Sequence, residues 1–183
     1  MPNLTIAGRA AAIADVQRSF LYEWMIPNIN KMTNNVINQE GLVVRIKSAV
    51  LPGRSNEIIT SVFMGTDQDF PGRIKFAKAI ALSIDETEDQ IVARAIHEWQ
   101  QKIFNADPMS PNAGHAMGSK KDYTTKSILR MYKYNGEKLP FDWVMYNSWP
   151  SNMEDVTLDM TSSDKVSRTL TLSFDYWKLE KSR

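Results

Sequence analysis

The run IALSIDETEDQIVARAIHEWQQKI, residues 80–103, decides the fold of this chain. Its first part continues an alternation of polarity from Phe76 to Ile84, which is typical of a strand with one buried face. The rest places apolar residues on one helical face, namely Ile91, Val92, Ala95, Ile96, Trp99 and Ile103. We therefore predict a strand followed at once by a helix over residues 87–105, whose apolar stripe packs on a sheet.

The start of this helix carries a capping signal. Thr87 followed three residues later by Gln90 matches a capping box, and the carboxylates of Glu88 and Asp89 suit the positive end of a helix dipole. Within the stripe, Trp99 is expected to be a structural anchor. Its burial contributes about 1.5–3 kcal/mol before the entropy cost is subtracted.

Further strand patterns precede this unit. Residues 18–27, RSFLYEWMIP, alternate and end near a proline, and residues 42–53, LVVRIKSAVLPG, form the next pattern. The polar, Asn-rich residues 28–41 between them indicate a loop. A third strand is predicted in EIITSVFMGTDQDFPG, residues 57–72. It runs into a turn marked by the breakers Asp67, Asp69, Pro71 and Gly72.

The second half of the chain predicts more antiparallel pairing. Residues 125–146 indicate a hairpin, closed by a tight two-residue turn at the Asn-Gly pair of residues 135–136. The stretch NSWPSN, residues 147–152, is interpreted as a turn leading to a short strand at 154–160. The last strand is predicted at residues 168–177. One of its faces carries Leu170, Leu172, Phe174 and Tyr176.

These patterns together predict a mainly β (α+β) fold. Seven or eight strands, mostly antiparallel, would form a β-barrel or a two-sheet sandwich with one flanking α-helix. No linker or internal repeat divides the sequence, so residues 1–183 are expected to be one domain. Residues 1–17 are interpreted as an N-terminal arm or short helix, and residues 105–123 as a long loop.

The numbers of charged residues and cysteines in the sequence exclude several classes of protein and site. Lys and Arg number 22 against 21 Asp and Glu, so a strongly basic nucleic-acid binder is not expected, and contact with a polyanion would be local or weak. The chain has no cysteine, which excludes disulfides, thiolate metal sites and a cysteine nucleophile. Neither a signal peptide nor a membrane-spanning run is indicated.

No catalytic or metal-binding motif is complete. His97 begins a sequence like the zinc-protease helix, but Gln101 occupies the second ligand position. His115 lies in a Gly-containing loop without a neighbouring carboxylate, and the pair Asp67 and Asp69 lacks the rest of a calcium loop. We expect no enzyme activity and no cofactor.

A small basic and aromatic patch is the remaining polar feature. Lys120 and Lys121 stand close to Tyr123 in the predicted loop. Such a patch could touch nucleic acid or an acidic neighbouring surface, although lysines of this kind more often simply solvate a loop.

An ordered set of features gives the chain a family resemblance. These features are Leu51-Pro52-Gly53 after a strand, a hairpin ending in Gly72, the run at 80–103, YTTKSILRMYKYNGE at 123–137, NSWPSNMEDVTLDM at 147–160 and LTLSFDYW at 170–177. In this order, the chain resembles the tail tube proteins of contractile-tailed bacteriophages, which are related to the Hcp-like tube proteins of type VI secretion. The resemblance covers roughly residues 18–178, while the loops at 28–39 and 105–123 depart from it.

The resemblance implies a structural subunit that forms hexameric rings stacked into a hollow tube. Each subunit would contribute strands to a continuous barrel, and DNA would pass through the lumen without sequence-specific binding. The implied partners are further copies of the chain, the tail sheath protein, and baseplate and tail-terminator proteins, with no membrane partner. The implied location is the tail of the virion, assembled in the host cytoplasm.

The resemblance also implies candidate contacts and anchors. A long hairpin at residues 51–74 would carry contacts between subunits or rings. The candidate contact residues are Arg54, Glu57, Phe63, Asp67, Asp69, Phe70, Lys120 and Lys121. The structural anchors are Trp99, Trp149, Pro150, Tyr176 and Trp177. Trp149 would hold the crossover into the last two strands against the core, with Pro150 shaping the bend.

Two questions stay open at this point. The lumen could be lined by Arg45 and Lys47, or by Thr171, Ser173 and Asp175. The alternatives to a tube subunit are a tube-initiating baseplate protein and a monomeric β-barrel that binds a small apolar ligand. The ten methionines could line such a pocket but suit core packing equally well.

Overall fold

The computed structural model of the chain describes residues 17–109, 119–161 and 163–182. Nearly all of the predicted N-terminal arm and the middle of the predicted 105–123 loop, with His115, lie outside the described residues. No described helix is both long enough and apolar enough to cross a membrane.

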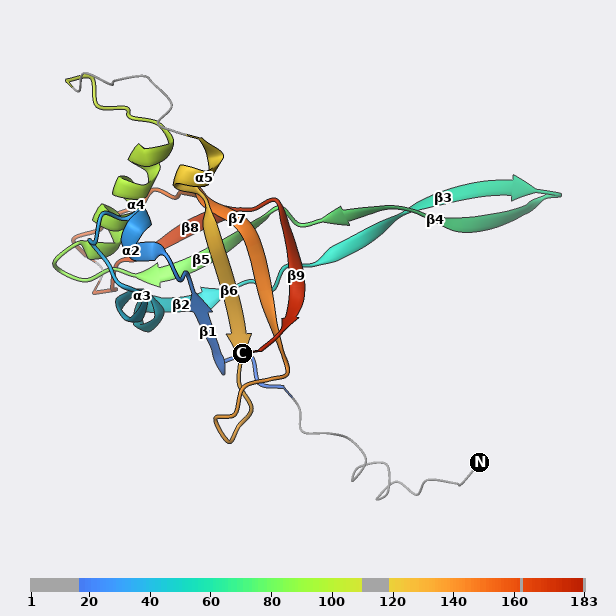
Figure 1. Ribbon diagram of the computed structural model, residues 1–183, viewed down its shortest axis with the longest axis horizontal. Helices are drawn as coiled ribbons and strands as arrows, with labels where there is room; N and C mark the ends of the chain where they lie inside the picture. The colour runs from blue at the N-terminus through green and yellow to red at the C-terminus, as the bar shows by residue number, and fades with distance from the viewer. Residues whose placement is uncertain (1–16, 110–118, 162, 183) are drawn as a thin grey trace.

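A seven-stranded antiparallel sheet forms the body (Figure 1). Its order is β1 (Tyr22–Met25), β6 (Thr125–Met131), β7 (Phe141–Met153), β8 (Ser167–Ser173), β5 (Ala79–Asp85) and β2 (Ile46–Ala49), with β9 (Tyr176–Lys181) also paired to β7. The predicted mainly β, antiparallel class is confirmed. The described residues form nine strands in all, rather than seven or eight.

Strand β7 belongs to two halves of this sheet. Its residues 141–146 pair with β9, whereas residues 149–153 pair with β8. Figure 1 shows β6, β7 and β9 running at a steep angle to β5 and β8. The change of partner lies at Asn147, whose φ of 56° is left-handed, and at a register shift after Pro150. The NSWPSN stretch is therefore a bent part of a strand, and its interpretation as a turn is wrong.

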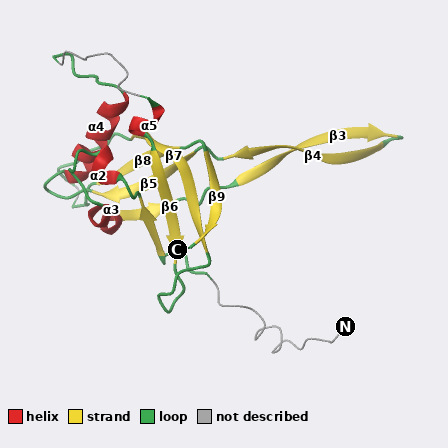
Figure 2. Ribbon diagram, in the orientation of Figure 1, coloured by secondary structure: helices red, strands yellow, loops and turns green. Residues whose placement is uncertain are grey.

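The core lies between the sheet and helix α4 (Ile91–Ile103), so the predicted strand–helix unit is confirmed. The buried side chains of α4 are Val92, Ala95, Ile96 and Trp99. They pack with Ile80, Leu82 and Ile84 of β5 and with Leu170 and Leu172 of β8. Figure 2 shows α2 (Ile29–Met32), α3 (Gln39–Arg45) and α4 gathered on the side of the molecule away from the projecting hairpin.

The predicted capping box is wrong. Gln90 has a left-handed backbone with φ 52° and its side chain forms no cap. The Glu86 carboxylate caps the helix instead, because it accepts hydrogen bonds from the backbone nitrogens of Val92 at 3.1 Å and Ala93 at 2.9 Å. A carboxylate at this position also suits the helix dipole. Arg168 donates to the same carboxylate at 2.7 Å and ties β8 to the helix start.

Short helices replace parts of the predicted loops and of one strand. The polar segment 28–41 contains α2 and the start of α3, and the residues 42–45 assigned to a strand complete α3. Asn38 explains the start of α3, because its side chain accepts a hydrogen bond from the backbone nitrogen of Gly41 at 2.7 Å. Helix α5 (Lys120–Tyr123) closes the predicted long loop.

The C-terminal predictions need three corrections. The hairpin of β6 and β7 is confirmed, but its loop is longer than two residues, and Gly136 at φ 82° supplies the positive angle while Asn135 does not. Residues 154–160 form no strand, since exposed side chains such as Leu158 have no surface to pack on. The predicted last strand breaks at Asp175, where β8 ends and β9 begins.

Candidate assembly surface

A hairpin projects from the body as an isolated arm (Figure 1). It is formed by β3 (Arg54–Phe63) and β4 (Thr66–Phe76), and no other described strand pairs with it. We call residues 54–76 the arm. Met64 and Gly65 close it with left-handed φ angles of 51° and 77°, as a tight two-residue turn requires. The predicted turn at residues 67–72 is therefore wrong, because these residues lie inside β4.

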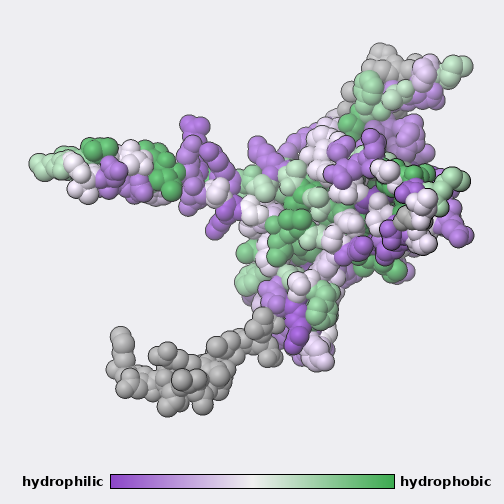
Figure 3. Space-filling view, turned by 180° about the vertical axis from the view of Figure 1, so that it is seen from behind, coloured by the Kyte–Doolittle hydropathy of each residue, from purple (hydrophilic) through white to green (hydrophobic). Residues whose placement is uncertain are grey.

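The arm exposes more apolar side chains to solvent than is expected for an isolated hairpin. Every side chain of β3 is exposed. The large apolar side chains are Ile58, Ile59, Val62, Phe63, Met64, Phe70 and Ile74, each at least half exposed. Figure 3 shows these hydrophobic groups along the projecting arm. A lone two-stranded hairpin is marginally stable, and a large exposed apolar patch marks an interaction surface.

The distal half of the arm, residues 58–71, has two different faces. Thr60 pairs with Asp69 and Val62 pairs with Asp67, so both carboxylates share one face. The Thr60 hydroxyl donates to Asp69 at 2.7 Å, while Asp67 makes no ion pair with any described residue. Ile59, Phe63 and Phe70 occupy the opposite, uncharged face.

The base of the arm is basic. We define the base as the proximal part of the arm together with its connections to the body, residues 53–57 and 72–78. It holds four cations, Arg54, Arg73, Lys75 and Lys78, and one anion, Glu57. Lys75 and Glu57 form an exposed ion pair at 3.2 Å, of little energetic weight. Arg54 and Arg73 make no ion pair within the described part of the chain. Figure 3 shows the hydrophilic band where the arm joins the body.

A groove of about 540 Å³ lies between the arm base and β9. Its lining is Arg54, Phe76, Tyr176, Trp177, Lys178 and Leu179, which includes two cations and no carboxylate. Trp177 fixes one wall, since its ring meets Phe76 edge to face at 6.1 Å and its Nε1 donates to the Gly53 carbonyl at 3.4 Å. We call this space the β9 groove.

Aromatic stacking organises the β9 side of the groove. The rings of Tyr146 and Tyr176 stack at 4.8 Å, and the Lys178 ammonium lies 5.6 Å from the centre of the Tyr176 ring. Glu180 accepts a hydrogen bond from the Tyr146 hydroxyl. This bond to Glu180 raises the pKa of Tyr146 to about 12.

The other predicted anchors have distinct positions. Trp99 is 1% exposed, and its Nε1 donates to the Tyr123 carbonyl at 2.7 Å. Trp149 is half-buried and meets the Tyr123 ring edge to face at 6.4 Å. Pro150 is fully buried within β7.

The two predicted contact lysines have different surroundings. The Lys120 ammonium lies 2.6 Å from both Asp175 oxygens, and the Asn147 amide donates to Asp175 at 2.7 Å. Lys120 is the main cause of the lowered pKa of Asp175. Lys121 is exposed and forms no ion pair among the described residues. Of these two lysines, Lys121 is the one that presents an unpaired charge to a neighbour.

The first of the two predicted lumen faces is divided between two elements, because Lys47 is exposed in β2 whereas Arg45 belongs to α3. Arg45 ends helix α3, and its guanidinium donates to the Gly41 carbonyl at 2.8 Å. Thr171 and Ser173 lie in β8 opposite Ala81 and Ala79, on a face of small uncharged side chains. Asp175 follows β8 and is held by Lys120 instead.

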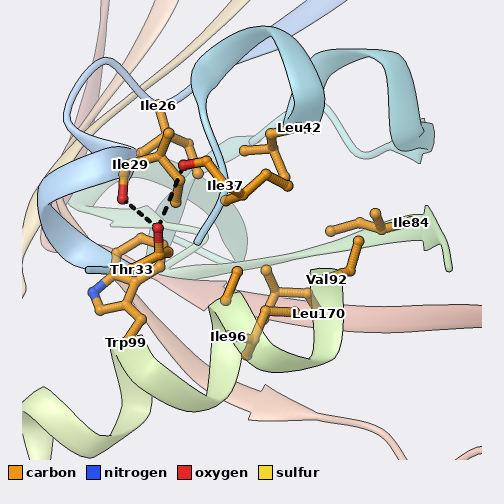
Figure 4. Close-up of a pocket in the computed structure, with 11 residues that line it drawn as sticks. Ile26, Ile29, Thr33, Ile37, Leu42, Ile84, Val92, Ile96, Trp99 and Leu170 are labelled. Atoms are coloured by element: carbon orange, nitrogen blue, oxygen red, sulfur yellow. Dashed lines mark hydrogen bonds between the residues drawn. The ribbon is translucent and has the colours of Figure 1, made fainter. Parts of the chain in front are cut away.

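Figure 4 shows a cavity in the core between α2, α3 and α4. Its volume is about 20 Å³, and the Thr33 hydroxyl beside it donates to the Ile29 carbonyl at 2.9 Å. A space of this size holds about one water, so the cavity is too small for the apolar ligand of the alternative reading. Among the described residues, no three His, Asp or Glu side chains are grouped closely enough to hold a metal ion.

Sequence reasoning missed the β9 groove. Phe76, Lys178 and Leu179 were not among the predicted contacts, because Phe76 is far in sequence from the adjacent pair Lys178 and Leu179. The glycine of the Met64-Gly65 turn at the tip of the arm could have indicated this turn. The more numerous turn-forming residues at 67–72 led to a turn being predicted there instead.

Comparison with known proteins identifies a family that matches this chain and solved structures with a similar fold. A family model described as "Phage tail tube protein" matches residues 17–180. A structure described as the anti-feeding prophage cap (AFP tube terminating cap) is similar with a TM-score of 0.62 and 15% identity, over 93% of this chain and 95% of that chain. No curated protein matches the sequence significantly.

Two structures from an extracellular contractile injection system are also similar in fold. The PVC sheath/tube terminator in the extended state has a TM-score of 0.59 and 15% identity, over 92% of this chain and 99% of that chain. The PVC sheath-tube complex in the extended state has a TM-score of 0.57 and 14% identity, over 97% and 99% of the two chains.

Proposed function

The chain belongs to the phage tail tube protein family, and from this premise we propose that it is the repeating subunit of a phage tail tube. Copies form six-membered rings, and the rings stack into a hollow conduit inside a contractile sheath. The role is structural, in the tail of the virion, and needs neither a cofactor nor catalysis.

The exposed arm is the observation that carries this proposal. Seven large apolar side chains on one two-stranded hairpin are stabilised in water only when another surface covers them. Further copies of the chain are the simplest source of that surface, since an interface between unlike patches of identical subunits closes into rings or extends into filaments.

Open strand edges support the same assembly. Among the described strands, β1, β2 and β9 each pair along one edge alone. Unpaired edges invite association with other strands, and a ring of subunits covers them. Each copy therefore contributes strands to a wall shared with its neighbours.

The net charge suits a conduit for DNA. A formal charge of +1 leaves no large cationic excess to hold the phosphate backbone. Phosphate neutralisation by many lysines and arginines would bind DNA tightly and slow its passage. DNA passes through the lumen without sequence-specific contacts.

The remaining partners follow from the position of a tube in a tail. The sheath surrounds the tube, the baseplate joins one end, and a terminator joins the other. A terminal ring, at the baseplate or at the terminator, is the second candidate function. It is favoured by similarity to cap and terminator structures over more than nine tenths of this chain.

Electron microscopy of the purified protein in negative stain tests the proposal. A tube subunit forms long hollow tubes, and a terminal component forms single rings. Ile59→Ser with Phe63→Ser on the arm should reduce assembly, whereas Val44→Ser, which removes an 84% exposed side chain from α3, should not. A protein that stays monomeric at high concentration would contradict both candidate functions.

A further inference from the structure

The arm separates charge along its length. The distal half, residues 58–71, has two charged residues, Asp67 and Asp69, both on one face. The base has four cations against one anion. Asp67, Arg54 and Arg73 form no ion pair in the described part of the chain. The two ends of the arm therefore carry opposite net charges.

The β9 groove has the chemistry to receive the distal acidic face. Its lining has two cations, Arg54 and Lys178, that can meet two carboxylates, and two apolar groups, Phe76 and Leu179. Lys178 and Leu179 are consecutive in β9, so they flank the open edge of this strand from opposite faces. The distal face places Val62 directly opposite Asp67, so it presents the same mixture of apolar and charged groups. Strand β9 also has one unpaired edge among the described strands, which leaves its backbone open along the groove.

The arm of a copy cannot fill the groove of the same copy. Arg54 lies at the base of the arm and lines the groove, whereas Asp67 lies near the tip. The ten residues of β3 span about 30 Å at about 3.3 Å each. The occupant must therefore come from another molecule.

We propose that the distal arm of one copy seats its acidic face in the β9 groove of a second copy. Asp67 and Asp69 then face Arg54 and Lys178, and Val62 packs towards Leu179. This contact deepens the tube proposed above and rests on it, by naming which surfaces of two copies meet. Because donor and acceptor surfaces differ, each copy uses both, and the contact repeats from copy to copy.

The charges in this contact give it specificity and a salt dependence. Like charges placed opposite each other disfavour association, and complementary charges steer it. Tube formation should therefore weaken as ionic strength rises, to the extent that the contact is open to solvent.

Charge reversal tests the pairing. Asp67→Lys with Asp69→Lys, or Arg54→Asp with Lys178→Asp, should raise the protein concentration needed for tubes by at least about tenfold. All four substitutions in one chain should restore assembly. Glu154→Lys with Asp155→Lys is the matched control, since it reverses two exposed acids in the loop after β7 and should leave assembly unchanged.

Disulfide trapping gives a second, independent readout. The chain has no cysteine, so Val62→Cys with Leu179→Cys introduces the only two thiols. Oxidation of assembled tubes should give a ladder of linked copies on a non-reducing gel. Ser61→Cys with Leu179→Cys is the control, because Ser61 points to the opposite face of the arm and should not link.

The outcomes separate this contact from the tube itself. The contact is supported if charge reversal blocks tube formation, if the fourfold variant restores it, and if the Val62→Cys, Leu179→Cys protein alone gives a ladder of linked copies. Normal tubes from both reversed variants, no rescue, or an equal ladder from the control pair would overturn it while leaving the tube standing. If the wild-type protein forms neither tubes nor rings, the proposed function fails first, and the contact fails with it.

Discussion

The Lys120 ammonium lies 2.6 Å from both carboxylate oxygens of Asp175, across 55 residues of sequence. Asn147, at the bend of β7, donates to the same carboxylate. Three elements thus meet at one side chain, where β8 ends and β9 begins. This cluster joins the helix α5 region to the corner of the sheet.

The Lys120–Asp175 pair predicts a pH-dependent stability. Its hydrogen bond lowers the pKa of Asp175 below the ordinary value of 3.8, so the stabilisation is present above that value and lost as pH falls through the lowered pKa. Lys120→Met should cost less than about 1 kcal/mol at neutral pH, because both side chains are well exposed. Thermal unfolding at neutral pH and at about pH 2 should show the difference shrink. Lys121→Met is the control, and a difference that persists in acid would exclude the ion pair as its cause.

Trp99 and Trp149 should differ in their effect on stability. Trp99→Ala removes a side chain that is 1% exposed and hydrogen-bonded, and should reduce the free energy of unfolding by about 3–5 kcal/mol. Trp149→Ala should cost less, because that ring is half-buried. Urea unfolding of both variants checks the order, and equal losses would show that the half-buried ring is as important as the buried one.

The Arg130–Asp142 pair should be costly to break from one side. The Arg130 Nη2 lies 2.8 Å from an Asp142 oxygen, and the two side chains are 13% and 6% exposed. Asp142→Ala removes the main partner of this largely buried cation and should lower the free energy of unfolding by about 3–5 kcal/mol. Replacing both, with Arg130→Met and Asp142→Leu, should recover most of that loss. Denaturant unfolding measures both variants. Glu137→Ala, which breaks the exposed Lys133–Glu137 pair, should leave the midpoint of denaturant unfolding almost unchanged.

Gly65 should matter for assembly more than for the core. Its φ of 77° is unfavourable for a residue with a Cβ, so Gly65→Val should strain the tip of the arm. We expect fewer tubes in negative stain and an unchanged melting temperature of the body. Gly53→Ala is the matched control, since an added Cβ there meets no atom within 4 Å and the backbone is not left-handed. A large drop in melting temperature for Gly65→Val would show that the arm is part of the folding unit.

Helix α4 and the preceding strand β5 could be predicted because their buried apolar residues recur in the sequence at helical and strand spacing. Val92, Ala95, Ile96 and Trp99 face the sheet, and nothing else explains their spacing. The residue that caps the start of α4 was harder to predict. Glu86 reaches the helix nitrogens from outside the expected capping motif, through a backbone turn at Gln90 that the sequence does not reveal.

The arm and the bend of β7 were harder to predict, for a common physical reason. Strand patterns record burial on one face, and the arm has no buried face in a single copy. Pro71 is tolerated in β4 because a two-stranded hairpin has open edges. Pro150 is tolerated in β7 at a register shift, where regular pairing is already interrupted. The β9 groove depends on contacts between distant residues, which no local pattern contains.

The link between the arm and the body has a mechanical consequence. Only Ala77 and Lys78 separate the end of β4 from the start of β5, and β5 lies between β8 and β2. A pull along the arm therefore loads the two ladders of β5 in shear, so that their hydrogen bonds resist together rather than opening one after another. We expect the arm to transmit tension into the sheet. This would help a tube of stacked subunits withstand the contraction of a surrounding sheath.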